Sequence, residues 1–318
     1  MRVVLLLLLA GVTVGTTLAQ APADQALDQK TIYAPLVGTG GPGRIAYVND
    51  DTAGWSIHVV NGDGTGDVAI TDFPLTTPDN PSWSPSGTRL AFDAPGAGSS
   101  LRQIYVMQDD GSDIQQITND PGGASDPSWS PDGSAIAFVS ARDGNQEIYV
   151  MNANGSNQVR LTNNSSLDVE PAWSPDGSRI VFTSTRDGNA EIYSMLANGA
   201  GLTRLTNDPI QDTSPAWSPN GLWIAFCSQH GGAPGGTTPP DLFVMSSNGS
   251  GAVNLTNTAE YVDCGPTWSP DSTRIVFTRG TIPPTPTSST LYSVGVDGTS
   301  YGFLAGSFRY NFSPAWSR

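Results

Sequence analysis

Five acidic residues of this 318-residue chain stand at fixed distances before a repeated proline. Asp168, Asp212 and Asp263 each precede the proline by three positions, and Asp126 and Glu170 precede it by one. Carboxylate oxygens bind Ca²⁺ and basic side chains, so a repeated carboxylate could form a ring of ligands at the mouth of a channel. Alternatively, these side chains accept hydrogen bonds from the backbone N–H groups of loops.

The elements that must position these carboxylates are repeats. Each proline begins a phrase of proline, a small residue, tryptophan and serine, and the phrase occurs six times at intervals of 44 to 51 residues. A period of this size is typical of repeat architectures. The tryptophans of the phrase are Trp83, Trp129, Trp173, Trp217, Trp268 and Trp316.

One repeat, 171–207, has the pattern of four short antiparallel strands. The sequence Ser-Pro-Asp-Gly at 174–177 favours a turn, and further turns are expected at 186–189 and 198–199. Alternating polar and apolar residues between these turns predict strands at 179–183, 191–195 and 203–206. A repeated four-stranded unit of this length is a β-propeller blade, whereas a β-sandwich needs no periodic tryptophan.

The two ends of the chain indicate how many blades there are. Segments 44–48, 55–60 and 67–71 match the second, third and fourth strands of a repeat, and no Pro-x-Trp precedes them. The last repeat contains only a first strand, at 314–317. We therefore predict an all-β, six-bladed propeller over 43–318, in which the C-terminal strand completes the first blade and removes open sheet edges. The tryptophans are expected to pack between neighbouring blades.

The N-terminal sequence and the charge predict an exported protein. Arg2 precedes an apolar run at 3–18, and small residues at 17 and 19 suit cleavage after Ala19, so 1–19 reads as a signal peptide and 20–42 as a linker. We expect a periplasmic or extracellular monomer without a membrane span. The formal net charge of −15 argues against binding to nucleic acid or to anionic membranes.

The two cysteines predict a disulfide. Cys227 ends the second strand of the fifth repeat, and Cys264 lies in the connection to the sixth repeat. Because strands alternate in direction, the loop after a second strand and the connection between blades share one face. Export would permit a bond between these two residues.

The same face carries the length variation of the repeats. Insertions follow the second strand at 94–102, 229–240 and 280–289. Variable loops on a rigid scaffold are common binding sites, so we expect the binding face here, with Arg142, Arg186 and His230 beside the five carboxylates. The only two histidines, His58 and His230, are too far apart in sequence to suggest a histidine metal site. No cofactor is therefore expected, although the carboxylates could hold a metal ion such as Ca²⁺.

The unit Trp-Ser-Pro-Asp-Gly-x-x-Ile-x-Phe, followed by Arg-Asp-Gly-Asn-x-Glu-Ile-Tyr and Leu-Thr-Asn, resembles the WD-like repeat of TolB-type β-propellers. Segments 173–182, 186–193 and 205–207 carry the match, as do 129–138, 142–149 and 161–163. In that family, the periplasmic TolB protein has an α/β domain before its propeller and works with the Tol–Pal envelope system, whereas this chain has only the linker at 20–42.

Repeat and resemblance together favour a non-catalytic binding module. Its partner would be a protein, a peptide or an envelope polymer, recognised through the long-loop face. One alternative is a carbohydrate-active or hydrolytic propeller enzyme with a carboxylate or metal site at the channel mouth. Another is a purely structural module of a cell-envelope assembly.

Overall fold

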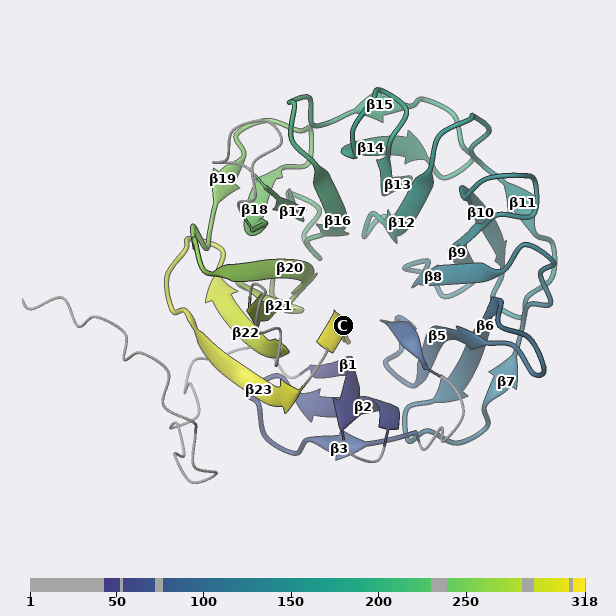
Figure 1. Ribbon diagram of the computed structural model, residues 1–318, viewed down its shortest axis with the longest axis horizontal. Helices are drawn as coiled ribbons and strands as arrows, with labels where there is room; N and C mark the ends of the chain where they lie inside the picture. Colours follow the sequence, from purple (N-terminus) through teal and green to yellow (C-terminus); the bar gives the residue numbers. More distant parts are fainter. Residues whose placement is uncertain are drawn as a thin grey trace, which may run out of the picture. The chain divides into compact units, whose positions relative to one another are not determined.

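The predicted six-bladed propeller is confirmed by the computed structural model. The model describes residues 43–51, 54–71, 77–229, 239–281, 289–308 and 311–317, all of which belong to one compact unit, Pro35–Arg318. These residues form strands and turns and no helix, so none of them forms a helix that could cross a membrane. Six four-stranded antiparallel sheets are arranged in a ring (Figure 1). The expected signal peptide, the linker and His230 lie outside the described residues.

Each blade runs from an innermost strand at the channel to an outermost strand at the rim. Blade one consists of β24 (Asn311–Trp316), β1 (Arg44–Asp51), β2 (Gly54–Asn61) and β3 (Val68–Ala69). Blades two and three consist of β4 (Asp79–Trp83), β5 (Arg89–Pro95), β6 (Arg102–Gln108) and β7 (Gln115–Gln116), then β8 (Ala124–Trp129), β9 (Ala135–Ser140), β10 (Glu147–Asn152) and β11 (Val159–Arg160). Blades four to six consist of β12 (Asp168–Trp173), β13 (Arg179–Ser184), β14 (Glu191–Leu196) and β15 (Thr203–Arg204), then β16 (Asp212–Trp217), β17 (Trp223–Ser228), β18 (Asp241–Ser246) and β19 (Val253–Asn254), then β20 (Tyr261–Trp268), β21 (Arg274–Thr281), β22 (Ser289–Gly295) and β23 (Gly302–Phe308).

The core lies between the blades. The second strand of a blade, such as β13, is buried on both faces because each face packs against a neighbouring blade, so its sequence is a nearly continuous apolar run. The outermost strand β15 has two residues, one exposed and one half-buried. Side-chain burial therefore falls steeply from the second strand to the rim.

The repeated tryptophans pack between blades, as the sequence predicts. Trp129 lies in a cluster with Ala91 and Val106 of blade two and with Phe138 of its own blade. Trp173 similarly contacts the cluster formed by Val139 and other residues of blade three. Five of the six tryptophans are only 4–9% exposed, and the sixth, Trp217, is half-buried.

The ring closes as predicted, with β24 paired antiparallel to β1 (Figure 1). Ile45 is the register partner of Trp316, and Ser317 N–H donates to the Arg44 carbonyl at 2.7 Å. The indole of Trp83 in blade two donates to the carbonyl of Ala315 at 3.1 Å. The C-terminal strand is therefore tied both to the strand it completes and to the next blade.

The predicted disulfide between Cys227 and Cys264 is present, with a Cα–Cα distance of 5.1 Å. Cys264 lies within β20, and not in the preceding connection as the sequence indicated, because that strand begins at Tyr261. The bond joins the end of β17 to the start of the next blade. It confirms that the loops after second strands and the connections between blades share one face, which we call the long-loop face.

Candidate functional site

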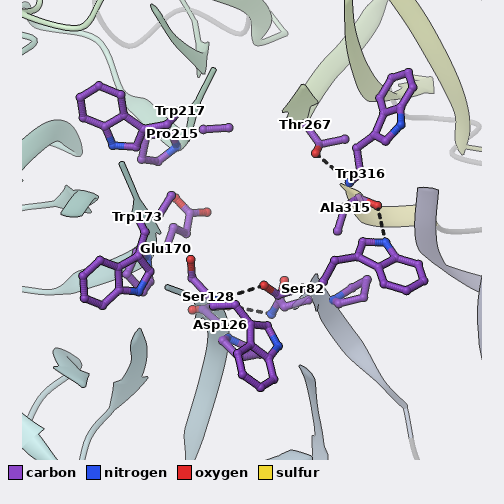
Figure 2. Close-up of a pocket in the computed structure, with 18 of the residues that line it drawn as sticks. Ser82, Asp126, Ser128, Glu170, Trp173, Pro215, Trp217, Thr267, Ala315 and Trp316 are labelled. Carbon is purple, nitrogen blue, oxygen red and sulfur yellow. Dashed lines mark hydrogen bonds between the residues drawn. The ribbon is translucent and has the colours of Figure 1, made fainter. Parts of the chain in front are cut away.

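The innermost strands surround a central channel (Figure 2). Its cavity has a volume of about 300 Å³ and is lined by residues of all six blades. The ionisable side chains in this lining are Asp126 and Glu170, and among the described residues no Lys, Arg or His lines it. The rings of Trp173, Trp217 and Trp316 lie on the outer side of the wall (Figure 2). The channel is therefore acidic.

A repeated β-bulge gives the channel wall its shape. The residue before the repeat proline has positive φ in four blades, although three of these residues are neither Asn nor Gly: Asn80 (49°), Asp126 (52°), Glu170 (56°) and Ser214 (55°). Gly265 takes the same conformation in blade six. At each position the pairing with the second strand shifts in register. Bulges of this kind redirect side chains and are frequent beside functional sites.

Asp126 is held within a network of polar and acidic groups. The amide of Asn80 donates to Asp126 Oδ1 at 2.6 Å and to Asp93 Oδ1 at 3.0 Å, and the backbone N–H of Asp126 donates to Asp93 Oδ1 at 3.1 Å. Burial raises the pKa of Asp126 well above its usual value, and the negative charges of Asp93, Glu170 and Asp79 raise it further. The side chain can therefore hold a proton in the empty channel.

Asp93 lies behind Asp126 and is completely buried. It forms an ion pair with Arg102, whose guanidinium also donates to the Asp93 carbonyl at 2.7 Å. Burial raises the pKa of Asp93 to about 6 in spite of this arginine, and Asp79 adds to the rise. Asp79 and Asn80 begin β4, and Asp93 lies in β5. These three groups around Asp126 of blade three therefore come from blade two.

Glu170 joins blade four to blade five. Its Oε2 accepts hydrogen bonds from Thr183 Oγ1 at 2.7 Å and from the backbone N–H of Ser214 at 2.6 Å. Its Oε1 accepts from Ser214 Oγ at 3.0 Å. Three donors fix the carboxylate, whose oxygens are directed toward the channel (Figure 2).

The other three predicted carboxylates do not line the channel. Asp168 and Asp263 are fully buried. Arg186 Nη2 donates to both oxygens of Asp168 at 3.0 and 2.8 Å, and Arg279 donates to Asp263 through Nε at 2.7 Å and through Nη2 at 2.6 Å. A ring of all five acids at the channel mouth is therefore corrected to a pair, Asp126 and Glu170. The reason is the β-bulge before the proline. It gives different directions to the acid three positions before the proline and the acid one position before it, although the two are only two residues apart in a strand.

Asp212 is the exception among the buried acids. It is 1% exposed, no ion pair to it occurs within the described segments, and its Oδ1 has no hydrogen-bond partner there. Burial raises its pKa to about 7, and the charges of Asp208 and Glu191 contribute. By alignment of the repeats, His230 stands where blade four has Arg186.

The two predicted arginines have structural contacts on the long-loop face. Arg142 pairs with buried Asp120 and stacks on Tyr149, with 4.6 Å from its guanidinium to the ring centroid. Arg186 pairs with Asp168 and stacks on Tyr193 at 4.9 Å. Each arginine side chain remains about one-fifth exposed, so a ligand could reach it.

Sequence reasoning missed Asn80, Ser214 and Asp93. The first two could have been found by aligning the position before each repeat proline, but the third stands behind the wall and has no such signal. Within the described residues, no three His, Cys, Asp or Glu side chains form a metal-binding group. One Gly-x-Ser-x-Gly pattern occurs at 298–302, but it forms the turn between β22 and β23, where no helix follows to make a nucleophile elbow.

The closed ring, the acidic channel and the variable loops on one face place the protein in the class of β-propeller scaffolds suited to binding. The chain belongs to the TolB β-propeller domain family, whose model matches residues 39–318. No functionally curated protein sequence matches the chain.

Solved structures agree on the fold. TolB from Acinetobacter baumannii is 25% identical, with a TM-score of 0.72 over 86% of this chain and 66% of that chain. A putative TolB from Agrobacterium tumefaciens is 21% identical, with a TM-score of 0.65 over 87% of this chain and 99% of that one. Hydrazine synthase from Kuenenia stuttgartiensis is 15% identical, with a TM-score of 0.70 over 87% of this chain and 47% of that one. This chain therefore spans 66% of the length of the first TolB.

Proposed function

We propose that the protein is an exported, non-catalytic binding module that receives a basic side chain of a peptide or protein partner in its channel. The observation that carries this proposal is the acidic lining, in which Asp126 and Glu170 stand with no basic residue among the described residues around the cavity. A cavity of about 300 Å³ is at the small end of the range for ligand sites, which suits one side chain better than a folded segment.

The channel mouth and the variable loops support the same use. β8 and β12 begin at the connections between blades, so Asp126 and Glu170 lie toward the long-loop face. A partner that contacts the long loops would have the channel mouth beneath it. Export is supported by the disulfide, since such bonds persist in oxidising compartments.

Because the pKa of Asp126 is raised, the affinity of the channel for a basic group should depend on pH in a definite direction. A bound cation favours the ionised carboxylate, whereas the empty channel favours the protonated form. Binding of a basic group must therefore release a proton, and affinity must increase as the pH rises toward the pKa of the empty site. Salt should weaken the binding because the attraction is electrostatic.

The test is selection of peptides from a random heptapeptide phage library on the intact protein. Selected peptides should be enriched in Lys or Arg. The double variant Asp126→Asn/Glu170→Gln should bind the synthetic peptides at least about tenfold more weakly, equivalent to about 1.4 kcal/mol. The matched control is Asp110→Asn/Asp297→Asn, which removes the same charge from two exposed hairpin turns and should bind as the wild type does. Peptides without basic residues, or equal binding by both double variants, would refute the proposal.

A second candidate is a hydrolase that uses the same two acids. The raised pKa of Asp126 beside the hydrogen-bonded Glu170 is the pattern of a general acid near a carboxylate. Release of p-nitrophenol from a panel of p-nitrophenyl glycosides, abolished in Asp126→Asn, would support this candidate over the non-catalytic one. Absence of turnover across the panel would count against it.

A further inference from the structure

A second cavity lies between blades four and five, away from the channel acids. It has a volume of about 560 Å³, and the turns that border it belong to the face opposite the long-loop face. We call it the interblade groove. Its lining includes Arg179, Ser194, Trp217, Asn220 and Asn248.

The repeats explain why this interface is open. In blade three, the equivalents of Arg179 and Ser194 are Ala135 and Val150, and these pack with Leu161 against the cluster of Trp173. Valine also stands at the position of Ser194 in blades one, two and five, as Val59, Val106 and Val244. Arg also stands at the position of Arg179 in blades one, two and six, so blade four differs from blades one, two, three and five in having Ser194 in place of the valine. The exchange leaves Trp217 half-buried, unlike the other five repeat tryptophans.

Some of the polar groups in the interblade groove are accessible to a ligand, although Ser194 itself is buried. Arg179 Nη1 donates to Ser194 Oγ at 3.0 Å, and the guanidinium has no ion pair with any described residue. Asp176 at the edge is occupied by its own turn, where it accepts from Ser174 Oγ and from Ser178. Asn220, Asn248 and Thr203 are exposed. The Oδ1 of each asparagine accepts hydrogen bonds within its own turn, so these residues supply side-chain NH₂ groups and a hydroxyl.

This combination has a particular chemistry. An indole offers a flat surface with a negative face, on which the slightly positive C–H groups of a pyranose ring can pack. Amides, hydroxyls and a guanidinium can bond to the ring hydroxyls as donors or acceptors. A few convergent polar groups beside an aromatic wall, in a cavity of this volume, suit a small ligand.

We propose that the interblade groove binds a pyranose saccharide, and that Arg179 favours a sugar carrying a carboxylate. The groove rests on residues that the channel does not use, apart from the shared wall residue Trp217. It is therefore independent of the peptide-binding proposal.

Blade six supplies an internal control. It also has an Arg and Ser pair at these positions, Arg274 and Ser293, but Arg274 donates a second hydrogen bond to the Ser300 carbonyl at 2.9 Å. Trp316, which faces that interface, is 7% exposed. The same pair of residue types therefore does not create a groove there.

The experiment is isothermal titration of the intact protein with glucuronate, glucose and N-acetylglucosamine. We expect glucuronate to bind with a dissociation constant of about 1 mM or lower, and more tightly than glucose. Ser194→Val should rebuild the apolar cover seen in blade three and weaken glucuronate binding at least about tenfold, without lowering the melting temperature. Ser293→Val should leave binding unchanged.

Arg179→Ala should remove the preference for glucuronate over glucose. Failure of all three sugars to bind would overturn the proposal, as would binding that Ser194→Val leaves intact. Neither result would touch the channel proposal, because Asp126 and Glu170 are unchanged in these variants.

Discussion

Deletion of residues 311–318 should open the ring, because this segment provides the innermost strand of blade one. β24 contributes pairing with β1, including the partners Ile45 and Trp316, and the backbone bond between Ser317 and Arg44. It also accepts the indole hydrogen bond of Trp83. Without it, β1 becomes an exposed edge and the last interblade interface loses its tryptophan.

The loss of folding free energy on deletion can be estimated first from the burial of Trp316. The residue is 7% exposed, and a buried tryptophan removes roughly 150–250 Å² from water. At about 25 cal/mol/Å² this is worth about 4–6 kcal/mol as an upper bound. The backbone hydrogen bonds of the strand add about 0.5–1.5 kcal/mol each. Domains are stable by only about 5–15 kcal/mol, so the deletion should remove most or all of the margin.

Thermal melting and size-exclusion chromatography measure the effect. The truncated protein should melt at a much lower temperature and aggregate through its open edge. Trp316→Ala should cost about 3–5 kcal/mol. Trp217→Ala, at the equivalent but half-buried position, should cost less. A truncated protein that remains monomeric with an unchanged melting temperature would refute closure by β24.

Two further predictions concern stability. The double variant Cys227→Ala/Cys264→Ala, or reduction of the wild type, should lower the free energy of unfolding by about 4 kcal/mol, because the disulfide closes a loop of 37 residues. Reductant should lower the melting temperature of the wild type but not that of the variant. The pKa of Asp212 in the folded state is about 7, above the ~3.9 of an unfolded chain. Between these two pH values the folded protein retains a proton that the unfolded chain has lost. The free energy of unfolding therefore falls as the pH rises, by about 1.4 kcal/mol per pH unit. Asp212→Asn should remove this decline in melting curves recorded from pH 4 to pH 8; an unchanged slope would show that another group causes it.

Much of the fold could be predicted because the repeat marks structural positions. The phrase around Trp173 gave the blade, and the incomplete repeats at 44–71 and 314–317 gave both the count and the closure. The disulfide followed from the expected export and from strand alternation, which brings the end of β17 and the start of β20 to one face. These inferences depend on period and direction, which sequence patterns carry directly.

The wall of the channel could not be predicted in the same way. A residue before proline is expected to be extended, yet Asp126 and Glu170 take positive φ. In a regular strand, Asp168 and Glu170 would face the same side, because side chains alternate with a period of two. The bulge breaks this rule: Asp168 is directed to the partly exposed Arg186, and Glu170 to the channel. Backbone conformation of this kind leaves no signal in residue types.

The same comparison separates the parts of the molecule that hold the ring together from the parts suited to recognition. Where side chains repeat, as in the pairs Asp168–Arg186 and Asp263–Arg279, the buried carboxylates accept their hydrogen bonds within the protein. Where the repeat varies, the channel lining has two acids without a basic partner, and the interblade groove has a half-buried indole. Departures from the repeat are therefore the positions at which substitutions should alter binding while the ring stays intact.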